Sequence, residues 1–527
     1  MSFTSISFVL FVGITAGIYF NVKKDSRWIV LLLASYVFYL LSSPKTFVFV
    51  LVTTITTFYG ARVIGQYELK YKAYIKENKE SLERAEKKKL KAANTKRKRK
   101  VLLGILLINF GILAFLKYFR VYINDLAIHF NGEPVFDAGF LIPLGISFYT
   151  FQSMGYLIDV YRGKYLADDN LAKFALFVSF FPQIIQGPIS RHDQLAPQLY
   201  KGHDFDYKRI KFGAQLILWG FFKKLVIADR VGIIVNEIFD NYEAYTGMYM
   251  LLAVLGYTIQ IYADFSGGME IARGVSQIFG IDMAKNFDRP YFSRSIPEFW
   301  RRWHMTLGHW CRDYIFYPIS LSSTFGKIGK KSRKIFGERI GKLFPVIIAQ
   351  LITFFTIGIW HGAEFKFIAY GLYQAIFIIG GILLEPYFKK LIEILHINTE
   401  AFSWRLFQIV RTFIIVVIGR FFSRATSFTA AIIMMKKSLV FNPRIFFDGS
   451  ILELGLTVED YGLLLVAILL WIFISVLQES GMKIRERLAE QNILFRWLIY
   501  LTAITVILVC GIYGSGFDAS GFIYREF

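Results

Sequence analysis

Long runs of apolar residues, separated by short polar segments, dominate the chain. A run of about 17–25 apolar residues is long enough to cross a lipid bilayer as a helix. About thirteen such runs occur, which predicts an all-α polytopic membrane protein. The expected spans lie near residues 5–20, 28–43, 46–65, 101–119, 140–160, 171–186, 212–229, 247–266, 343–360, 366–385, 404–422, 461–477 and 495–514.

Two of these runs are interrupted by residues that break helices. The run 141–156 contains Pro143, Gly145 and Gly155, and the run 174–188 ends in Pro182, Gly187 and Pro188. Non-helical backbone at membrane depth is tolerated only where it is buried in protein or lines a cavity. The interruptions therefore predict a cavity within the helical bundle, in the middle third of the chain.

The basic residues are placed unevenly and predict an orientation. Lys23, Lys24 and Arg27 separate the first two expected spans, and residues 67–100 hold 14 basic and five acidic residues. Both groups fall on the cytoplasmic side if the N-terminus lies outside the cell. The segment 67–100 is expected to be a helical, solvated loop that contacts anionic headgroups. Attraction of a phosphate-rich cofactor or a carrier protein is the alternative.

Composition excludes several other classes of protein. Hydrophobic residues make up 55% of the chain, aromatic residues 18% and charged residues only 19%, which fits neither a soluble globular protein nor a disordered one. The two cysteines, Cys311 and Cys510, exclude a disulfide framework. The basic run at 84–100 contains no aromatic residues, so nucleic-acid binding is not expected. The first span lacks a basic start and a cleavage site, so we expect it to be retained.

His361 is the first candidate for chemistry. It ends a long apolar run and lies in the tripeptide Trp360-His361-Gly362. A histidine in a low-dielectric site stays neutral, and a neutral imidazole can take a proton from an attacking hydroxyl. Trp360 offers a flat wall, and Gly362 leaves room for another molecule. The alternative is an interfacial histidine beside a tryptophan of the aromatic belt.

A second cluster of functional candidates lies between Pro297 and Pro318. Read as a helix, this segment places Trp300 and His304 on one face and pairs Glu298 with Arg302. The spacing of His304 and His309 does not suit a zinc pair, so no metal is expected. The segment is either a helix in the membrane interface or a re-entrant element with His304 facing a cavity.

A third candidate is the segment Tyr257–Gly268. Gln260 and Asp264 are four residues apart on one helical face in an apolar setting, and Ser266-Gly267-Gly268 is expected to end the helix. An intramembrane carboxylate usually pairs with a base. A structural partner such as an arginine is therefore the preferred interpretation of Asp264, with catalysis as the alternative.

The order of these motifs resembles the membrane-bound O-acyltransferase (MBOAT) family over residues 100–390. The end of the chain, GSGFDASGFIYREF, further resembles the bacterial branch typified by the alginate O-acetyltransferase membrane subunit and its peptidoglycan- and cellulose-acetylating relatives. Gly268 and Glu270 differ from the residues that this branch more often carries there, so the acceptor stays open. The motifs are IPLGISFYTFQSMGYLIDVYRG (142–163), FFPQIIQGPISRHDQLAPQL (180–199), the segment 264–266, RPYFSRSIPEFWRRWHMTLGHWCRDYIFYPI (289–319) and IGIWHG (357–362).

The resemblance implies a fold and an activity. The fold is a ring of transmembrane and re-entrant helices around a central tunnel that joins the two faces of the membrane. By the motif match, His361 corresponds to the central catalytic histidine and His304 to a second, supporting polar residue. The family moves an acyl group from a cytoplasmic thioester, commonly acetyl-CoA, to an acceptor reached from outside. In this branch an SGNH-type partner often completes delivery to a polysaccharide.

The resemblance and the motifs also predict donor-binding residues, partners, a location and segment boundaries. Trp303, Arg302, Trp360 and Asp264 are the expected donor-binding residues, with acetyl-CoA or another acyl thioester as substrate and no permanently bound cofactor. The expected partners are membrane lipids, an SGNH-type acetyltransferase and a polysaccharide synthase complex, at the bacterial plasma membrane. The expected segments are N-terminal transmembrane helices (1–66), the basic loop (67–100), the catalytic core (101–390) and C-terminal transmembrane helices (391–527).

Three alternative functions stay open at this point. One is D-alanyl transfer to teichoic acid, which is a different acyl transfer on the same family scaffold. The second is a transporter, because broken helices and an intramembrane acid also suit that class. The third is a scaffold that holds a partner enzyme at the membrane.

Overall fold

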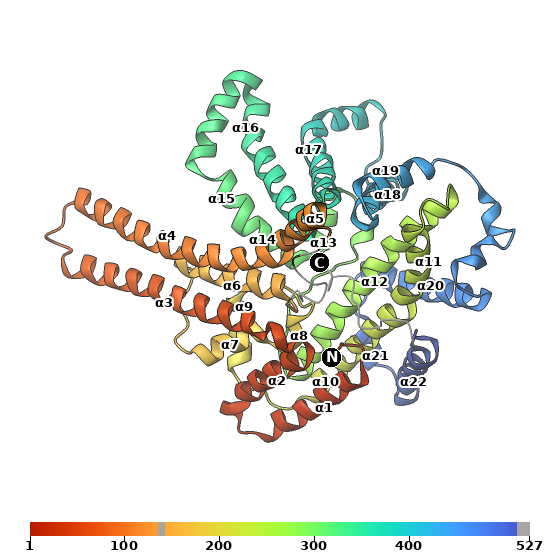
Figure 1. Ribbon diagram of the computed structural model, residues 1–527, viewed down its shortest axis with the longest axis horizontal. Helices are drawn as coiled ribbons and strands as arrows, with labels where there is room; N and C mark the ends of the chain where they lie inside the picture. Colours follow the sequence, from red (N-terminus) through yellow and green to blue (C-terminus); the bar gives the residue numbers. More distant parts are fainter. Residues whose placement is uncertain (134, 136–142, 514–527) are drawn as a thin grey trace. The chain divides into compact units, whose positions relative to one another are not determined.

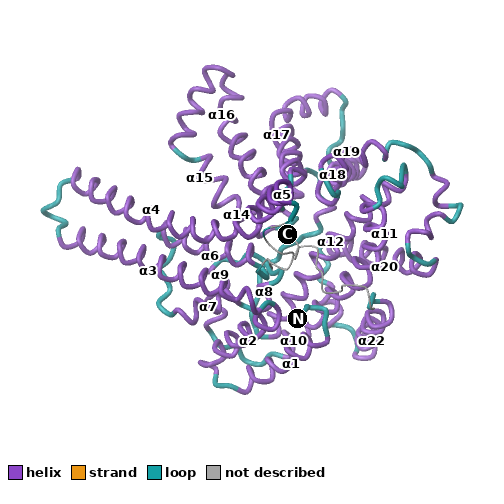
Figure 2. The backbone as a smooth tube through the Cα atoms, viewed as in Figure 1, coloured by secondary structure: helices purple, strands orange, loops and turns teal. Residues whose placement is uncertain are grey.

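The computed structural model describes residues 1–133, 135 and 143–513. All regular secondary structure in these residues is helical, as the purple segments in Figure 2 show. The all-α prediction is therefore confirmed. The ending 514–527, which carried part of the family resemblance, lies outside the described residues, as do the first residues of the expected span 140–160 and the last of the span 495–514.

The chain divides into two compact units, Met1–Ala214 with Ala272–Ala284 and Gln215–Ile271 with Lys285–Phe527. The first unit contains α1 (Ile6–Asn21), α2 (Arg27–Ser42), α3 (Phe47–Glu77), α4 (Arg84–Ala114), α5 (Arg120–Asn131), α6 (Ile146–Arg162), α7 (Leu171–Ser179), α8 (Phe181–Ile184), α9 (His192–Tyr200) and the first half of α10 (Tyr207–Phe221).

The second unit holds the histidine motifs. It contains α11 (Asp229–Asp240), most of α12 (Met248–Ile278), α13 (Ile296–Arg302), α14 (Met305–Cys311), α15 (Tyr317–Ser320), α16 (Ser323–His361), α17 (Phe365–Ile394), α18 (Phe402–Arg424), α19 (Phe428–Lys437), α20 (Val458–Glu479), α21 (Ile484–Ala489) and α22 (Ile493–Cys510). Two π-helical segments, η4 (Phe222–Ala228) and η6 (Arg312–Phe316), interrupt the regular helices.

Nine helical segments of the described residues are long and apolar enough to cross a membrane, and each matches a predicted span. The chain is thus a multi-pass membrane protein. Three of the other four predicted spans form shorter pieces, namely α1, α6 and the pair α7 and α8. The fourth forms α10 with η4, a continuous helical segment that carries the charged residues Lys223 and Lys224. The nine segments are Lys24–Ser42, Pro44–Glu77, Arg84–Phe119, Met248–Ile278, Ser323–His361, Phe365–Ile394, Phe402–Arg424, Val458–Glu479 and Ile493–Cys510.

The interrupted runs in the first unit break near the predicted prolines and glycines except at Gly155, which lies inside the continuous helix α6. Gly145 precedes α6 in the left-handed conformation (φ 67°), and its missing side chain lets the carbonyl of Ile184 approach. Phe180 leaves helical geometry and separates α7 from α8. The tunnel that the resemblance implies stays a prediction.

The basic segment 67–100 is helical on both sides of a short turn. It comprises the last turns of α3 and the first half of α4, which lie side by side in Figure 1. Lys98 Nζ lies 2.7 Å from Glu68 Oε2 and ties the two helices together. The predicted helical loop is confirmed as a helical hairpin.

The expected helix end at Ser266-Gly267-Gly268 was wrong, because α12 continues through these residues to Ile278. A Cβ on Gly220 would lie 2.6 Å from the carbonyl oxygen of Gly267, and one on Gly267 would lie 2.9 Å from that of Gly220. Small residues allow such close helix crossings in membranes. The glycines therefore serve packing rather than termination.

A second close crossing fixes the end of α16, which lies beside α17 in Figure 1. A Cβ on Gly358 would lie 2.6 Å from the carbonyl oxygen of Phe367, and Gly371 of α17 faces the backbone of Gly358 at the same level. Gly358 precedes His361 by less than one helical turn. The crossing therefore sets the position of that histidine.

We expect Gly358→Ala to destabilise the protein, because the new methyl group meets backbone that cannot move aside. Overpacking of this kind costs about 1–3 kcal/mol. The matched control is Gly111→Ala in α4, where nothing lies within 4 Å of the new Cβ. Thermal unfolding in detergent should show a lower midpoint for Gly358→Ala and an unchanged or higher one for Gly111→Ala. Equal midpoints would contradict the importance of the crossing.

Candidate functional site

The segment Pro297–Pro318 is not one helix, because the chain turns at His304. Helix α13 ends at Arg302, and His304 adopts a left-handed backbone conformation (φ 44°) before α14 begins at Met305. The predicted common face of Trp300 and His304 was therefore wrong. The predicted pair of Glu298 and Arg302 is confirmed, at 2.8 Å between Oε1 and Nη2.

Backbone hydrogen bonds to a separate segment explain this turn. The Met305 amide donates to the Asn286 carbonyl at 2.9 Å, and the Asp288 amide donates to the Arg302 carbonyl at 2.9 Å. Left-handed backbone is unfavourable for a residue other than glycine unless the surroundings impose it. The two hydrogen bonds bracket His304 and hold it in this conformation.

The Asn286 side chain orients the His304 ring. Its Oδ1 accepts hydrogen bonds from the Thr306 amide at 3.0 Å and the Thr306 hydroxyl at 2.8 Å. A carbonyl oxygen has two lone pairs, so these bonds saturate it. The His304 Nδ1 lies 3.3 Å from both Nδ2 and Oδ1 of Asn286. Because Oδ1 already accepts two hydrogen bonds, we assign Nδ1 as the acceptor of the Nδ2 amide N–H. This assignment puts the ring proton of His304 on Nε2.

Burial keeps His304 uncharged. Only 2% of the residue is exposed, and the ring of Phe265 meets it edge-on with centroids 4.9 Å apart. His304 lies outside the candidate spans, and removal from water lowers its pKa to about 3. A neutral imidazole with its proton on Nε2 can donate a hydrogen bond at physiological pH but cannot supply a positive charge.

His361 is the last residue of α16 and is half-buried. The Tyr370 ring meets its imidazole edge-on, with centroids 5.8 Å apart and an interplanar angle of 80°. The Phe367 ring stacks on the imidazole, with centroids 6.3 Å apart and an interplanar angle of 20°. Phe367 also occupies the space beside Gly362. Gly362 therefore makes room for a ring of this chain, whereas the sequence suggested room for another molecule.

Trp360 joins the two histidines. Its indole centroid lies 4.9 Å from that of His361 and 5.7 Å from that of His304. Trp360 is buried. The structure thus brings together, within the second unit, the two histidines and the tryptophan that the sequence predicted as site residues.

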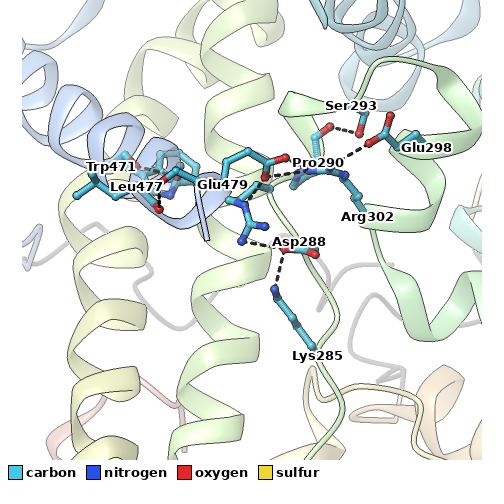
Figure 3. A network of polar contacts seen from close by, with 12 residues as sticks. Lys285, Asp288, Pro290, Ser293, Glu298, Arg302, Trp471, Leu477 and Glu479 are labelled. Atoms are coloured by element: carbon cyan, nitrogen blue, oxygen red, sulfur yellow. Dashed lines mark hydrogen bonds and ion pairs between the residues drawn. The ribbon is translucent and has the colours of Figure 1, made fainter. Parts of the chain in front are cut away.

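Trp303 and Arg302 are held by other parts of the second unit. The Trp303 ring is buried and stacks on Phe299 at 5.5 Å. Arg302 lies between two carboxylates, as Figure 3 shows, with Nη2 2.8 Å from Glu298 and Nη1 2.9 Å from Glu479 of α20. These ion pairs anchor α13 to α20. The donor-binding roles of both residues stay predictions.

Asp264 has the basic partner that its position in an apolar helix predicts. Lys224 Nζ lies 2.6 Å from Asp264 Oδ1 and 2.9 Å from Asp229 Oδ1. The partner is thus a lysine rather than an arginine, supplied by the π-helical segment η4. All three side chains are buried. This geometry favours a structural role for Asp264, and its donor-binding role stays a prediction.

Sequence reasoning missed Asn286, Tyr370 and Lys224. Asn286 and Tyr370 act through contacts with segments distant in sequence, and no local pattern identifies them. Lys224 did carry a signal, because it interrupts the apolar run 212–229, and ionisable residues in such runs have functional or structural partners.

The fold and site define a multi-pass, all-α membrane protein with two histidines joined by a tryptophan. Residues 166–336 match the MBOAT, membrane-bound O-acyltransferase family. The probable alginate O-acetylase AlgI of Pseudomonas syringae pv. tomato is 31% identical over 424 residues, 80% of this chain and 71% of the relative. The chain therefore belongs to the membrane-bound O-acyltransferase family and is an O-acyltransferase.

Two further relatives differ in their named activity. The peptidoglycan O-acetyltransferase of Helicobacter pylori is 31% identical over 299 residues, 51% of this chain and 53% of the relative. The teichoic acid D-alanyltransferase of Bacillus subtilis is 32% identical over 253 residues, 47% of this chain and 60% of the relative. The alginate relative thus matches a larger share of the chain than either.

We expect Asn286→Leu to impair both stability and acyl transfer. The substitution keeps the volume but removes the Asn286 acceptor of two buried Thr306 hydrogen bonds, at about 1–3 kcal/mol for each bond. It also removes the hydrogen bond that fixes the His304 ring. Thermal unfolding and turnover of the purified protein should both fall, whereas Asn398→Leu, at an exposed asparagine, should change neither. Normal turnover in Asn286→Leu would show that His304 does not need this orientation.

Proposed function

We propose that this protein takes an acetyl group from acetyl-CoA on the cytoplasmic side and transfers it across the membrane for O-acetylation of an extracytoplasmic polysaccharide. Membership of the O-acyltransferase family supports acyl transfer to a hydroxyl. The names of its alginate and peptidoglycan relatives support acetyl as the group and a polysaccharide as the acceptor. The observation that carries the proposal is the Trp360 ring in contact with both His361 and His304.

In this proposal His361 is the general base. Its neutral imidazole takes the proton of the acceptor hydroxyl as the oxygen attacks the thioester carbonyl. The new C–O bond forms, the C–S bond breaks, and the thiolate leaves with the proton returned by the imidazolium. Positioned general bases typically accelerate such steps roughly 10²–10⁴-fold. The alternative, a transient acetyl group on His361, needs the same imidazole.

His304 supports the reaction through its neutral N–H. Attack on the thioester carbonyl places negative charge on the carbonyl oxygen. A positioned hydrogen-bond donor in a dry site stabilises that charge. His304 carries its proton on Nε2 because Asn286 Nδ2 donates to Nδ1. Its role in this proposal is to orient the thioester or to stabilise the oxyanion.

The basic hairpin of α3 and α4 supports entry of an anionic donor from the cytoplasm. Its 14 basic residues between positions 67 and 100 attract the phosphates of CoA or the surface of a carrier protein, and the positive-inside rule puts them on the cytoplasmic side. We further propose the bacterial plasma membrane as the location, and an SGNH-type acetyltransferase and a polysaccharide synthase complex as partners.

A second candidate function is D-alanyl transfer to teichoic acid, which the similarity to the Bacillus subtilis enzyme favours. The donor distinguishes the two proposals. Purified protein in proteoliposomes is supplied with radiolabelled acetyl-CoA or with a D-alanyl thioester on a carrier protein, together with a hydroxyl acceptor. Ester formation and release of free CoA from the first donor support acetyl transfer. Passage of intact donor without thiol release would indicate a transporter.

We expect His361→Ala to reduce acetyl transfer by about 10²–10⁴-fold, because the variant lacks the general base. The measurement is thiol release and ester formation by the purified variant, with the thermal unfolding midpoint as the test of folding. His309→Ala is the matched control, since His309 is an exposed histidine of α14. Near-normal turnover of a folded His361→Ala would contradict the general-base role of His361.

His304→Gln should reduce turnover by the same factor at every pH between about 5 and 9. Because burial lowers the pKa of His304 to about 3, the imidazole is already neutral throughout this range, and no charge is lost with it. The ratio of wild-type to variant turnover is therefore flat against pH. A ratio that rises as the pH falls would mean that protonated His304 takes part in the reaction.

A further inference from the structure

Arg420 is a buried arginine of α18 that the proposed mechanism does not use. Only 1% of the residue is exposed. Its neighbour Gly419 brings the α18 backbone close to α17, since a Cβ there would lie 3.0 Å from Gln374 Nε2 and 3.1 Å from Tyr373 Cε1. An arginine within an apolar, membrane-spanning helix is costly and marks a functional position.

Two contacts of the Arg420 guanidinium bear on the site. Its central carbon lies 4.5 Å from the centroid of the Trp303 indole, a cation–π contact. Its Nη1 donates a hydrogen bond to the Tyr370 hydroxyl at 3.3 Å. Trp303 and Tyr370 are themselves buried. The Arg420 side chain thus contacts two rings, one at the end of α13 and one in α17.

Each of the two rings, Trp303 and Tyr370, lies next to one of the two histidines. Trp303 immediately precedes His304, so the plane of its indole fixes the start of the left-handed turn. Tyr370 meets the His361 ring edge-on at 5.8 Å. The contacts that link His304 to His361 through Arg420 are therefore different from those through Trp360.

We propose that Arg420 is a positioning residue for acyl transfer, which fixes the His304 turn and the His361 imidazole relative to each other through Trp303 and Tyr370. The inference rests on the proposed function, because it assigns the two histidines to one reaction. Arg420 acts through the two rings and is not assigned a contact with substrate. Trp303, which the sequence marked as donor-binding, becomes one of the two rings through which it acts.

The chemistry of the side chain explains why an arginine stands here. A planar guanidinium can stack on an indole face while its edge donates a directed hydrogen bond, whereas a lysine ammonium is a compact charge without that planar edge. Arg420→Lys should therefore keep the positive charge but lose the simultaneous contact with Trp303 and Tyr370. This difference separates positioning from a purely electrostatic role.

The test compares Arg420→Lys, Arg420→Gln and Tyr370→Phe in the full-length protein. Displacement of catalytic groups by about 1 Å can cost about 100-fold in rate. We expect kcat to fall about 10- to 100-fold in both Arg420 variants and less in Tyr370→Phe, with the KM for acetyl-CoA nearly unchanged. Arg411→Gln, at an exposed arginine of the same helix, should behave as wild type.

A double-mutant cycle gives the decisive readout. If Arg420 acts through the Tyr370 hydroxyl, the kcat loss of Arg420→Lys combined with Tyr370→Phe is smaller than the product of the two single losses. A role confined to general stability would instead lower the unfolding midpoint without this coupling. Wild-type kcat in folded Arg420→Lys, or independent losses in the cycle, would overturn the inference.

Two controls keep the outcome interpretable. Tyr370→Phe removes one oxygen atom and keeps the buried ring, so it tests the same path if the Arg420 variants do not fold. Wild-type kcat in Tyr370→Phe would then overturn the inference. His361→Ala is assayed in parallel. An inactive His361→Ala beside normal Arg420 variants refutes only the positioning role, whereas a wild-type protein that transfers no acetyl group refutes the proposed function itself.

Discussion

A polar group buried in a bilayer or in the protein interior has no water to bond with, so it must find its partner within the protein. This constraint explains most of the contacts around the site. Lys224 lies between Asp264 and Asp229, Asn286 satisfies the Thr306 donors, and Arg420 contacts Trp303 and Tyr370. Each of these contacts also fixes a helix or turn in place. The contacts that satisfy the buried polar groups therefore also set the geometry of the site.

In the second unit, the His361 imidazole lies among tightly packed backbone and aromatic side chains. Gly358 lets α16 cross α17 at backbone distance just before His361, and Phe367 and Tyr370 then enclose the imidazole. Side chains in contact with close-packed backbone lose little further freedom when a substrate arrives. Because the rings are fixed before the reaction begins, the protein does not need to order them at the moment of transfer.

Charged residues of the segment Pro297–Pro318 hold its short helices in place. Arg302 carries ion pairs with Glu298 of its own helix and with Glu479, which lies 177 residues further along the chain. These contacts, seen in Figure 3, attach the short helix α13 to the long helix α20. A helix of two turns between proline and a left-handed turn has little stability of its own, so the anchor accounts for its defined position.

The sequence by itself determined the membrane class, the nine long apolar spans and the motif order. Hydrophobicity over about twenty residues is a local property, and so is the presence of a histidine at the end of an apolar run. Only the tertiary structure decided that the chain turns at His304, that α12 continues through Gly267 and that Arg302 is tied to Glu479. Each of these features depends on a partner far away in sequence, and helix packing alone determines which distant residues meet.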